Sequence, residues 1–234
     1  MKKLGLVGGT GPESTLVYYR ELNRRVHEKT GGKAFPEISV ESVDLYKALG
    51  YVEKEQYKEL ERYLGNALCN LVKGGAEVAA LTAGTMHVIY DDLKENVPVP
   101  LVSIPKSVCE TAVLRRYTKV GLLGTIFTMK QDFFKKPFWE NGIDVFLPEE
   151  EEMALVNERI SGELEYGIVK ESTRAELVDI IAGMKERQNI EAVILGCTEL
   201  PLILNSKCCP VDCLDIMDIH INRLAELITD EPWR

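Results

Sequence analysis

A cysteine stands directly after a short apolar run in the segment EAVILGCTEL, residues 191–200. The run has the length of a buried strand, and Gly196 marks the turn that follows it. A cysteine at the start of a helix has a lowered pKa, because the helix dipole favours the thiolate. A thiolate can accept a proton from carbon, and the thiol can return one. The segment therefore predicts Cys197 as a catalytic acid–base group.

The same strand and turn occur earlier in the chain, without the cysteine. In EVAALTAGTMH, residues 77–87, Glu77 aligns with Glu191, and Ala83 with Cys197 at an offset of 114 residues. A second pair, KLGLVGG (3–9) and KVGLLGT (119–125), aligns at an offset of 116 residues. Two separate stretches at nearly one offset indicate an internal duplication.

The elements around these turns alternate between strand and helix. Apolar strands are predicted at 3–7, 38–43, 77–81, 101–104 and 119–123, with helices at 12–28, 53–73 and 216–229. This order is typical of parallel sheets flanked by helices. We therefore expect an α/β protein of two pseudo-symmetric lobes: residues 1–99 plus 215–234 form the N-terminal lobe, and residues 100–214 form the C-terminal lobe.

The turns after the strands are the expected binding site, because ligands of open parallel sheets collect at the carboxyl ends of the strands. If the lobes face each other, the site lies in the cleft between them. Hydroxyls, close backbone approach and helix starts fit a small carboxylate, although threonine and glycine are also ordinary cap and turn residues. The predicted binding residues are Gly9, Thr10, Ala83, Gly84, Thr85, Thr125, Thr128, Thr198 and Glu199.

Composition excludes several classes of partner. The 234 residues include 28 Lys and Arg against 37 Asp and Glu, so the net charge of −9 argues against nucleic acid. No run approaches the ~18 apolar residues of a membrane span. Because the sequence shows no export signal, we predict that the six cysteines are free thiols and that the protein is cytoplasmic.

Two cofactor hypotheses find little support in the spacing. Cys208, Cys209 and Cys213 contain no C-x-x-C pair, so we predict no metal site there. The stretch GLVGGTG (5–11) follows a strand and opens a helix, but it is not the G-x-G-x-x-G of a dinucleotide fold. Such a fold also leaves the recurrence of the turn after residue 119 unexplained.

Four stretches together resemble the aspartate/glutamate racemase superfamily, above all its bacterial aspartate racemase branch: GLVGGTGPESTLVYYREL (5–22), GTMH (84–87), LLGTIFTMKQDF (122–133) and GCTEL (196–200). The resemblance runs the length of the chain. It implies two α/β lobes, a homodimer, no cofactor, and racemisation of an amino acid by α-proton abstraction and return.

The resemblance also assigns one proton-carrying group to each lobe. One is Cys197, and the other is a cysteine or threonine at the position that is Ala83 here, followed by Gly84 where the family has asparagine. Alanine has no exchangeable proton, so Thr82, His87 or a water is the candidate replacement. The family also implies basic residues for a side-chain carboxylate. Of the residues in those regions, Lys47, Lys54 and Tyr166, none matches.

Three functions remain open on these grounds. The first is an amino-acid racemase of the aspartate/glutamate type. The second is a decarboxylase-like enzyme in which a single cysteine protonates an enolate, and the third is a carboxylate-binding protein without turnover. Solvent deuterium separates them: a racemase labels the α-carbon with inversion, a decarboxylase labels its product, and a binding protein labels nothing.

Overall fold

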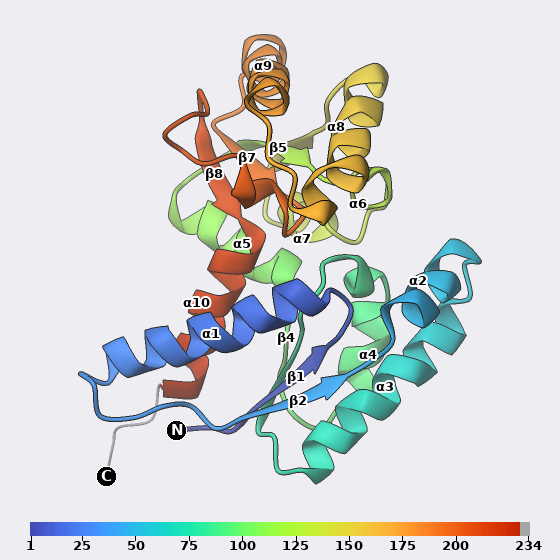
Figure 1. Cartoon of the computed structure of the whole chain (residues 1–234), viewed down its shortest axis with the longest axis vertical. Coiled ribbons are helices and arrows are strands. Elements are labelled where there is room, and N and C mark those ends of the chain that lie inside the picture. The colour runs from blue at the N-terminus through green and yellow to red at the C-terminus, as the bar shows by residue number, and fades with distance from the viewer. Residues whose placement is uncertain (230–234) are drawn as a thin grey trace. The chain divides into compact units, whose positions relative to one another are not determined.

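Each half of the chain folds around one four-stranded parallel sheet flanked by helices, as Figure 1 shows. The structure is a computed structural model in which residues 1–229 are described. The first unit comprises Met1–Ser103 and the chain from His220, and the second comprises Ile104–Ile219. The predicted α/β class with two parallel sheets is thereby confirmed.

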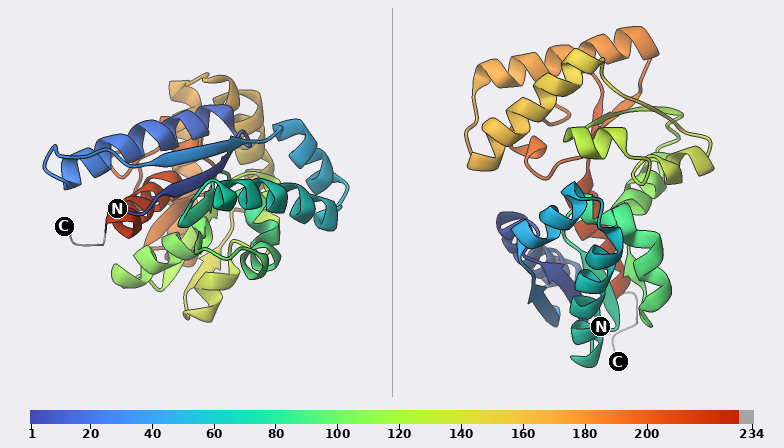
Figure 2. Two further views of the ribbon diagram at one scale, coloured as in Figure 1. Left: turned by 90° about the horizontal axis from the view of Figure 1, so that it is seen from below. Right: turned by 90° about the vertical axis from the view of Figure 1, so that its right-hand side faces the viewer.

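The first unit is built around strand β1. Its sheet has the order β2-β1-β3-β4, and all neighbours are parallel. The strands are β1 (Leu4–Gly8), β2 (Ile38–Ser42), β3 (Val78–Leu81) and β4 (Leu101–Val102). The helices are α1 (Pro12–Lys29), α2 (Leu45–Glu53), α3 (Tyr57–Lys73), the 3-10 helix η1 (Thr85–Ile89), α4 (Tyr90–Asn96) and the part of α10 (Ile216–Thr229) from His220. In the left view of Figure 2, α1 covers one face of this sheet and α3 the other.

The second unit repeats this plan around strand β5. Its sheet has the order β6-β5-β7-β8 and is also parallel. The strands are β5 (Lys119–Leu123), β6 (Asp144–Phe146), β7 (Ala192–Leu195) and β8 (Asp212–Asp215). The helices are α5 (Ile104–Leu114), α6 (Ile126–Lys130), α7 (Lys136–Glu140), α8 (Glu150–Gly162), the 3-10 helix η2 (Leu164–Tyr166), α9 (Glu171–Gln188) and the 3-10 helix η3 (Leu200–Leu202).

The duplication extends to the packing of single residues. Gly5 in β1 and Gly121 in β5 stand at the offset of 116 found in the sequence. A Cβ at Gly5 would lie 2.9 Å from the Ala76 side chain, and one at Gly121 would lie 2.9 Å from both Ile190 and Met184. Each central strand therefore has a glycine where the neighbouring side chains leave no room for a Cβ.

Alternating side chains of the second sheet fill two separate cores. In β7, Ala192 and Ile194 face a cluster with α5 and α7, whereas Val193 and Leu195 face a cluster with α8 and α9. Because successive side chains of a strand point to opposite faces, both faces of this sheet are apolar and covered. This explains why β7 reads as an unbroken apolar run in the sequence.

The main departure from the expected elements lies before α3. The predicted helix 53–73 begins only at Tyr57, and a separate helix, α2, precedes it and ends at Glu53. The Asp44 side chain starts α2 by accepting a hydrogen bond from the Lys47 N–H at 2.9 Å. Glu55 then adopts φ +54°, which no helix continues through. The apolar spacing of α3 was visible in the sequence, but this break was not.

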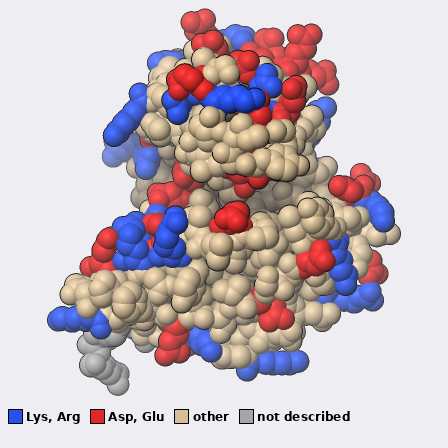
Figure 3. Space-filling view, viewed as in Figure 1, with Lys and Arg blue, Asp and Glu red and all other residues tan. Residues whose placement is uncertain are grey.

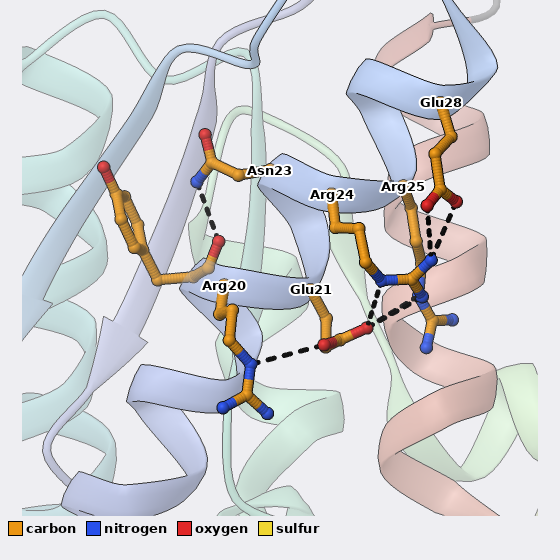
Figure 4. A network of polar contacts seen from close by, with 7 residues as sticks. Arg20, Glu21, Asn23, Arg24, Arg25 and Glu28 are labelled. Carbon is orange, nitrogen blue, oxygen red and sulfur yellow. Dashed lines mark hydrogen bonds and ion pairs between the residues drawn. The ribbon is translucent and has the colours of Figure 1, made fainter.

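Charged side chains on the exposed face of α1 form a local network, drawn in Figure 4. Arg24 pairs with Glu21 at 2.8 Å and with Glu28 at 2.7 Å, one helical turn away on either side. The hydrogen bond from Arg24 holds the pKa of Glu21 below its usual value. Exposed pairs of this kind contribute little to stability, because water screens the two charges. Figure 3 likewise shows acidic and basic side chains interspersed on the visible face. Within residues 1–229, no helix is long and apolar enough to cross a membrane.

A buried polar cluster joins α1, β4 and α10 in the first unit. The Tyr18 hydroxyl lies 2.7 Å from Nδ1 of His220, whose Nε2 lies 3.3 Å from the Val102 carbonyl oxygen. The carbonyl can only accept, so Nε2 carries the proton and Nδ1 accepts from Tyr18. Burial lowers the pKa of His220 to about 3, and burial lowers the pKa of His87, in the same unit, to about 4.

These two histidines predict a loss of stability in mild acid. Their folded pKa values lie below the ~6.5 of an unfolded histidine, so the unfolded state takes up protons first as the pH falls. The stabilisation is complete above about pH 6.5 and declines by about 1.4 kcal/mol per pH unit for each histidine, down to about pH 4. Urea unfolding between about pH 7.5 and pH 4.5 measures this slope.

His220→Gln keeps an acceptor for Tyr18 and removes one titrating group, so it should roughly halve the histidine part of the slope. An identical slope in wild type and His220→Gln would contradict this account.

Candidate active site

Two turns of the first unit lie side by side because their strands are neighbours. The turn 8–11 follows β1 and the turn 82–85 follows β3, and the hydroxyls of Thr15 and Thr82 lie 3.4 Å apart. Gly9 has φ +82°, and a Cβ there would lie 2.2 Å from the Val43 carbonyl oxygen. Only glycine therefore fits this turn, which runs closely against the end of β2.

The hydroxyl of Thr10 is the open polar group of the first turn. Thr10 is only 7% exposed, and its Oγ1 has no hydrogen-bond partner among residues 1–229. The neighbouring hydroxyls are occupied, since Ser14 and Thr15 each donate to the Gly11 carbonyl at 2.9 Å. A buried hydroxyl without a partner is costly, so this donor fits a bound acceptor at the end of β1.

Hydrogen bonds from side chains to backbone carbonyls fix the second turn of this unit, residues 82–85. Thr82 is fully buried and donates to the Val7 carbonyl at 3.1 Å. His87 is 3% exposed, and its Nδ1 lies 3.1 Å from the carbonyl oxygen of Ala83, to which it donates. With its pKa lowered by burial, His87 is neutral at pH 7. These contacts fix the backbone of the turn, and a role of Thr82 or His87 as the second base stays a prediction of the sequence. Ala83, Gly84 and Thr85 are partly exposed.

The corresponding turns of the second unit are adjacent in the same way. A Cβ at Gly124, after β5, would lie 3.6 Å from the Gly196 carbonyl carbon, after β7. Thr125 caps α6 by accepting from the N–H of Thr128, and the two hydroxyls are 3.2 Å apart. Thr128 is buried, whereas Thr125 and Thr198 are partly exposed. The structure thus brings together the predicted residues of each unit at the carboxyl ends of its strands.

The thiol of Cys197 is bound to a carboxylate within its own turn. Sγ donates to Oε2 of Glu199 at 2.8 Å, and the Thr198 hydroxyl donates to the other oxygen, Oε1, at 2.8 Å. All three residues are partly exposed. A single proton is therefore positioned between a sulfur and a carboxylate at the surface of the turn. The sequence had predicted Glu199 as a binding residue only.

The expected lowering of the Cys197 pKa is wrong. Only the three-residue η3 (Leu200–Leu202) follows the turn, so no long helix supplies a dipole. Burial, and then the charge and hydrogen bond of Glu199, raise the pKa of Cys197 well above its usual value. The thiol is therefore protonated at neutral pH. Of the four turns, only 8–11 leads into a long helix, the 18-residue α1.

A second carboxylate near the thiol was missed in the sequence. Glu165, in η2, also raises the pKa of Cys197 through its charge. The pKa of Glu165 is itself raised, first by burial and then by the charge of Glu199. Glu165 is more than thirty residues from Cys197 in the chain, and no local pattern indicated that the fold would bring them into electrostatic contact.

The remaining cysteines form no recognisable centre. Cys208 and Cys209 have their sulfur atoms 4.0 Å apart, and Cys213 lies at the start of β8. Across the described residues, no group of three or more His, Cys, Asp or Glu side chains is arranged to hold a metal ion. Cys109 is buried, and burial raises its pKa to about 11.

The match to a known family covers almost the whole chain. A profile of the Asp/Glu/hydantoin racemases matches residues 7–224. The chain belongs to this family. The match spans the two turns of the first unit from Gly8 on and both turns of the second unit, so the racemase resemblance seen in the sequence is confirmed.

Solved structures and curated relatives agree with this assignment. The chain is 33% identical to a candidate Asp/Glu racemase from Yersinia pestis, with a TM-score of 0.93 over 98% of this chain and 100% of the other. It is 38% identical to an aspartate racemase homologue from Pyrococcus horikoshii OT3, with a TM-score of 0.88 over the same shares. A glutamate racemase from Limosilactobacillus reuteri is 26% identical over 66% of this chain and 55% of its own length.

The carboxylate beside Cys197 predicts a change in thiol reactivity. Replacing Glu199 with glutamine removes the nearby charge, so the pKa of Cys197 should fall toward its ordinary value and more thiolate should be present at pH 7. Alkylation of Cys197 by iodoacetamide, followed peptide by peptide with mass spectrometry, should become several-fold faster. Glu186→Gln, at an exposed position of α9, is the control and should leave the rate unchanged. A slower or equal rate in Glu199→Gln would show that the carboxylate does not hold the proton on sulfur.

Proposed function

We propose that this protein is a cofactor-independent amino-acid racemase in which Cys197 is one acid–base group. The observation that carries the proposal is the hydrogen bond from the Cys197 thiol to Glu199. Membership of the racemase family supports the reaction type. The bond supports the assignment of the cysteine, because it gives the sulfur a defined partner with which to exchange its proton.

The proton movements follow from this pair. To act as a base, Cys197 passes its proton to the Glu199 carboxylate, and the thiolate then takes the α-proton while the C–H electron pair stays on the substrate as a carbanion. To act as an acid, the thiol gives its proton to the carbanion and Glu199 remains charged. A thiolate of raised pKa is a stronger base once formed, which suits the weakly acidic α-proton.

The first unit contributes binding groups to this proposal. The buried Thr10 hydroxyl has no partner among the described residues, so it can donate to a substrate carboxylate without losing another bond. The N-terminus of α1 follows directly, and helix starts favour anions. We propose Gly9, Thr10 and the partly exposed Thr85 as binding residues here, and Thr125, Thr128 and Thr198 in the second unit.

The alanine at position 83 favours a second candidate function, a reaction that uses only one acid–base group. The position that aligns with Cys197 carries only a methyl group, and Thr82 and His87 are committed to backbone carbonyls. A single-cysteine enzyme that protonates an enolate after loss of CO₂ needs no second base. Binding of a carboxylate without turnover is the remaining alternative. A homodimer and a cytoplasmic location stay predictions of the sequence.

Removal of the thiol tests the proposed function. Cys197→Ala should abolish deuterium uptake at the α-carbon in D₂O, with a loss of about 10²-fold or more, because an acid–base group typically contributes ~10²–10⁴-fold. Proton NMR of a panel of L- and D-amino acids measures the uptake. Cys69→Ala, at an exposed thiol on α3, is the matched control and should keep its activity. Undiminished uptake in Cys197→Ala would rule out the mechanism, and uptake by no amino acid in the wild type would rule out the function.

A side chain at position 83 should restore the second acid–base group. Ala83→Cys or Ala83→Thr is expected to raise racemisation above the wild-type rate, and Gly84→Asn in the same chain should raise it further by restoring the asparagine of the family pattern. Optical rotation and α-deuterium uptake together distinguish inversion from exchange with retention. Fast inversion by the wild type, unchanged by these substitutions, would show that another residue is the second base.

A further inference from the structure

Three thiols lie in one short stretch of the second unit, where the loop 203–211 leads from η3 into β8. Cys208 and Cys209 belong to the loop, and Cys213 is the second residue of β8, a strand at the edge of its sheet. All three are free and partly exposed. All three also pack against the apolar cluster that the sheet forms with α8 and α9. The sheet edge therefore carries a group of thiols that the proposed racemase reaction does not use.

Backbone hydrogen bonds fold the loop back on itself and hold Cys209 close to Cys213. The N–H of Cys209 donates to the Asn205 carbonyl at 3.1 Å. The N–H of Cys213 donates to Oγ of the next residue, Ser206, at 3.0 Å. Because Asn205 and Ser206 are consecutive, the backbones of Cys209 and Cys213 are held at the same point of the loop.

Cys209 is the middle member of this group of thiols. Its Sγ lies 4.0 Å from Sγ of Cys208. Its thiol also donates a hydrogen bond to the sulfur of Cys213, and this bond lowers the pKa of Cys213 and raises the pKa of Cys209. Of these two residues, Cys213 therefore ionises more readily, and the thiolate is the nucleophilic form of cysteine.

We propose that Cys209 and Cys213 form a reversible disulfide when a peroxide oxidises the protein. The loop geometry supports this pair, because both backbones are tied to Asn205 and Ser206 and both side chains pack on the same apolar cluster. Thiol pairs that oxidise in reducing compartments are usually catalytic or redox-sensing rather than structural. The modification is independent of the proposed racemase reaction, so either can stand without the other.

Two displacement steps form the disulfide. The Cys213 thiolate attacks one oxygen of hydrogen peroxide, so that a sulfur–oxygen bond forms, the oxygen–oxygen bond breaks and hydroxide leaves. Cys209 then attacks the sulfenic sulfur of Cys213, so that the disulfide forms, the sulfur–oxygen bond breaks and the second hydroxide leaves. In total, the two thiols lose two protons and two electrons, and one peroxide takes them up to become two molecules of water.

The chain itself disfavours a disulfide between the neighbours Cys208 and Cys209. Consecutive Cα atoms are ~3.8 Å apart across a trans peptide, whereas disulfides usually join Cα atoms ~4.4–6.8 Å apart. The residues between Cys209 and Cys213 remove this limit. Cys208 is therefore expected to stay reduced, and it serves as the matched control.

Two other thiols should react with peroxide later than Cys213. Burial raises the pKa of Cys109 to about 11. Burial, and then the charge of Glu199, raise the pKa of Cys197 well above its usual value. Both thiols keep their protons at neutral pH, and a protonated thiol is a poor nucleophile. We therefore expect oxidation of Cys213 before oxidation of Cys197.

Mass spectrometry of the tryptic peptide 208–223, which contains all three thiols, measures the modification. The purified protein is treated with hydrogen peroxide, its remaining thiols are blocked with N-ethylmaleimide, and the peptide is analysed without reduction. Untreated protein should carry three maleimides on this peptide. Oxidised protein should carry a single maleimide, on Cys208, and lack two hydrogens, and treatment with dithiothreitol should restore all three reactive thiols.

Serine variants locate the bond and assign the two roles. Cys208→Ser should form the disulfide as the wild type does. Cys213→Ser should lose it. Cys209→Ser should lose it as well, but there the sulfenic acid of Cys213 stays unresolved and should be trapped by dimedone.

Three maleimides on the peptide at a peroxide dose that already oxidises Cys197 or the exposed Cys69 would overturn the proposal. A disulfide that survives Cys213→Ser, disappears in Cys208→Ser or joins two chains would overturn the assignment to Cys209 and Cys213. The wild-type peptide needs no substitution, so its result decides the proposal even where a variant fails to fold.

Discussion

The proposed chemistry of this chain depends on one hydrogen bond, from the Cys197 thiol to the Glu199 carboxylate. The two residues are separated by Thr198 alone, and both stand in the turn between β7 and the short 3-10 helix η3. Gly196 makes that turn possible, since a Cβ there would lie 2.7 Å from the Leu123 carbonyl oxygen. A proton held between sulfur and carboxylate, rather than a thiolate stabilised by a helix dipole, is the state from which any proton transfer by Cys197 must start.

The duplicated architecture explains where this bond lies and why it has no counterpart. Both units place a glycine-containing turn after the centre strand and another after the neighbouring strand, and in each unit the two turns touch. The first unit uses its threonine and histidine to fix the turn backbone, and the second leaves its cysteine and glutamate partly exposed. Two similar folds therefore carry different side chains at corresponding turns: Ala83 in the first unit and Cys197 in the second.

The sequence predicted those features of the fold that depend on the local pattern of residues. Apolar runs located β1, β3, β5 and β7, and helical patterns located α1 and α10. The repeat offset gave the two matching sheets. The sequence did not predict α2, because that helix depends on the Asp44 cap and on the left-handed conformation of Glu55.

The protonation states of the site residues could not be predicted from the local sequence, for a different reason. The state of a thiol depends on which charges the fold brings near it, and Glu165 approaches Cys197 from a separate element. The prediction of a lowered pKa assumed a long helix after Gly196, and the chain forms one 3-10 turn there. Residue types at the strand ends could be read from the sequence, whereas their protonation required the three-dimensional neighbours.

Titration of the Cys197 thiolate tests the central claim most directly. The thiolate absorbs near 240 nm, so the difference in absorbance between wild type and Cys197→Ala across a pH series reports this one group. The account predicts no step below about pH 9, because burial and the Glu199 carboxylate keep the proton on sulfur. A step of one thiolate near neutral pH would contradict it and would restore the helix-dipole explanation.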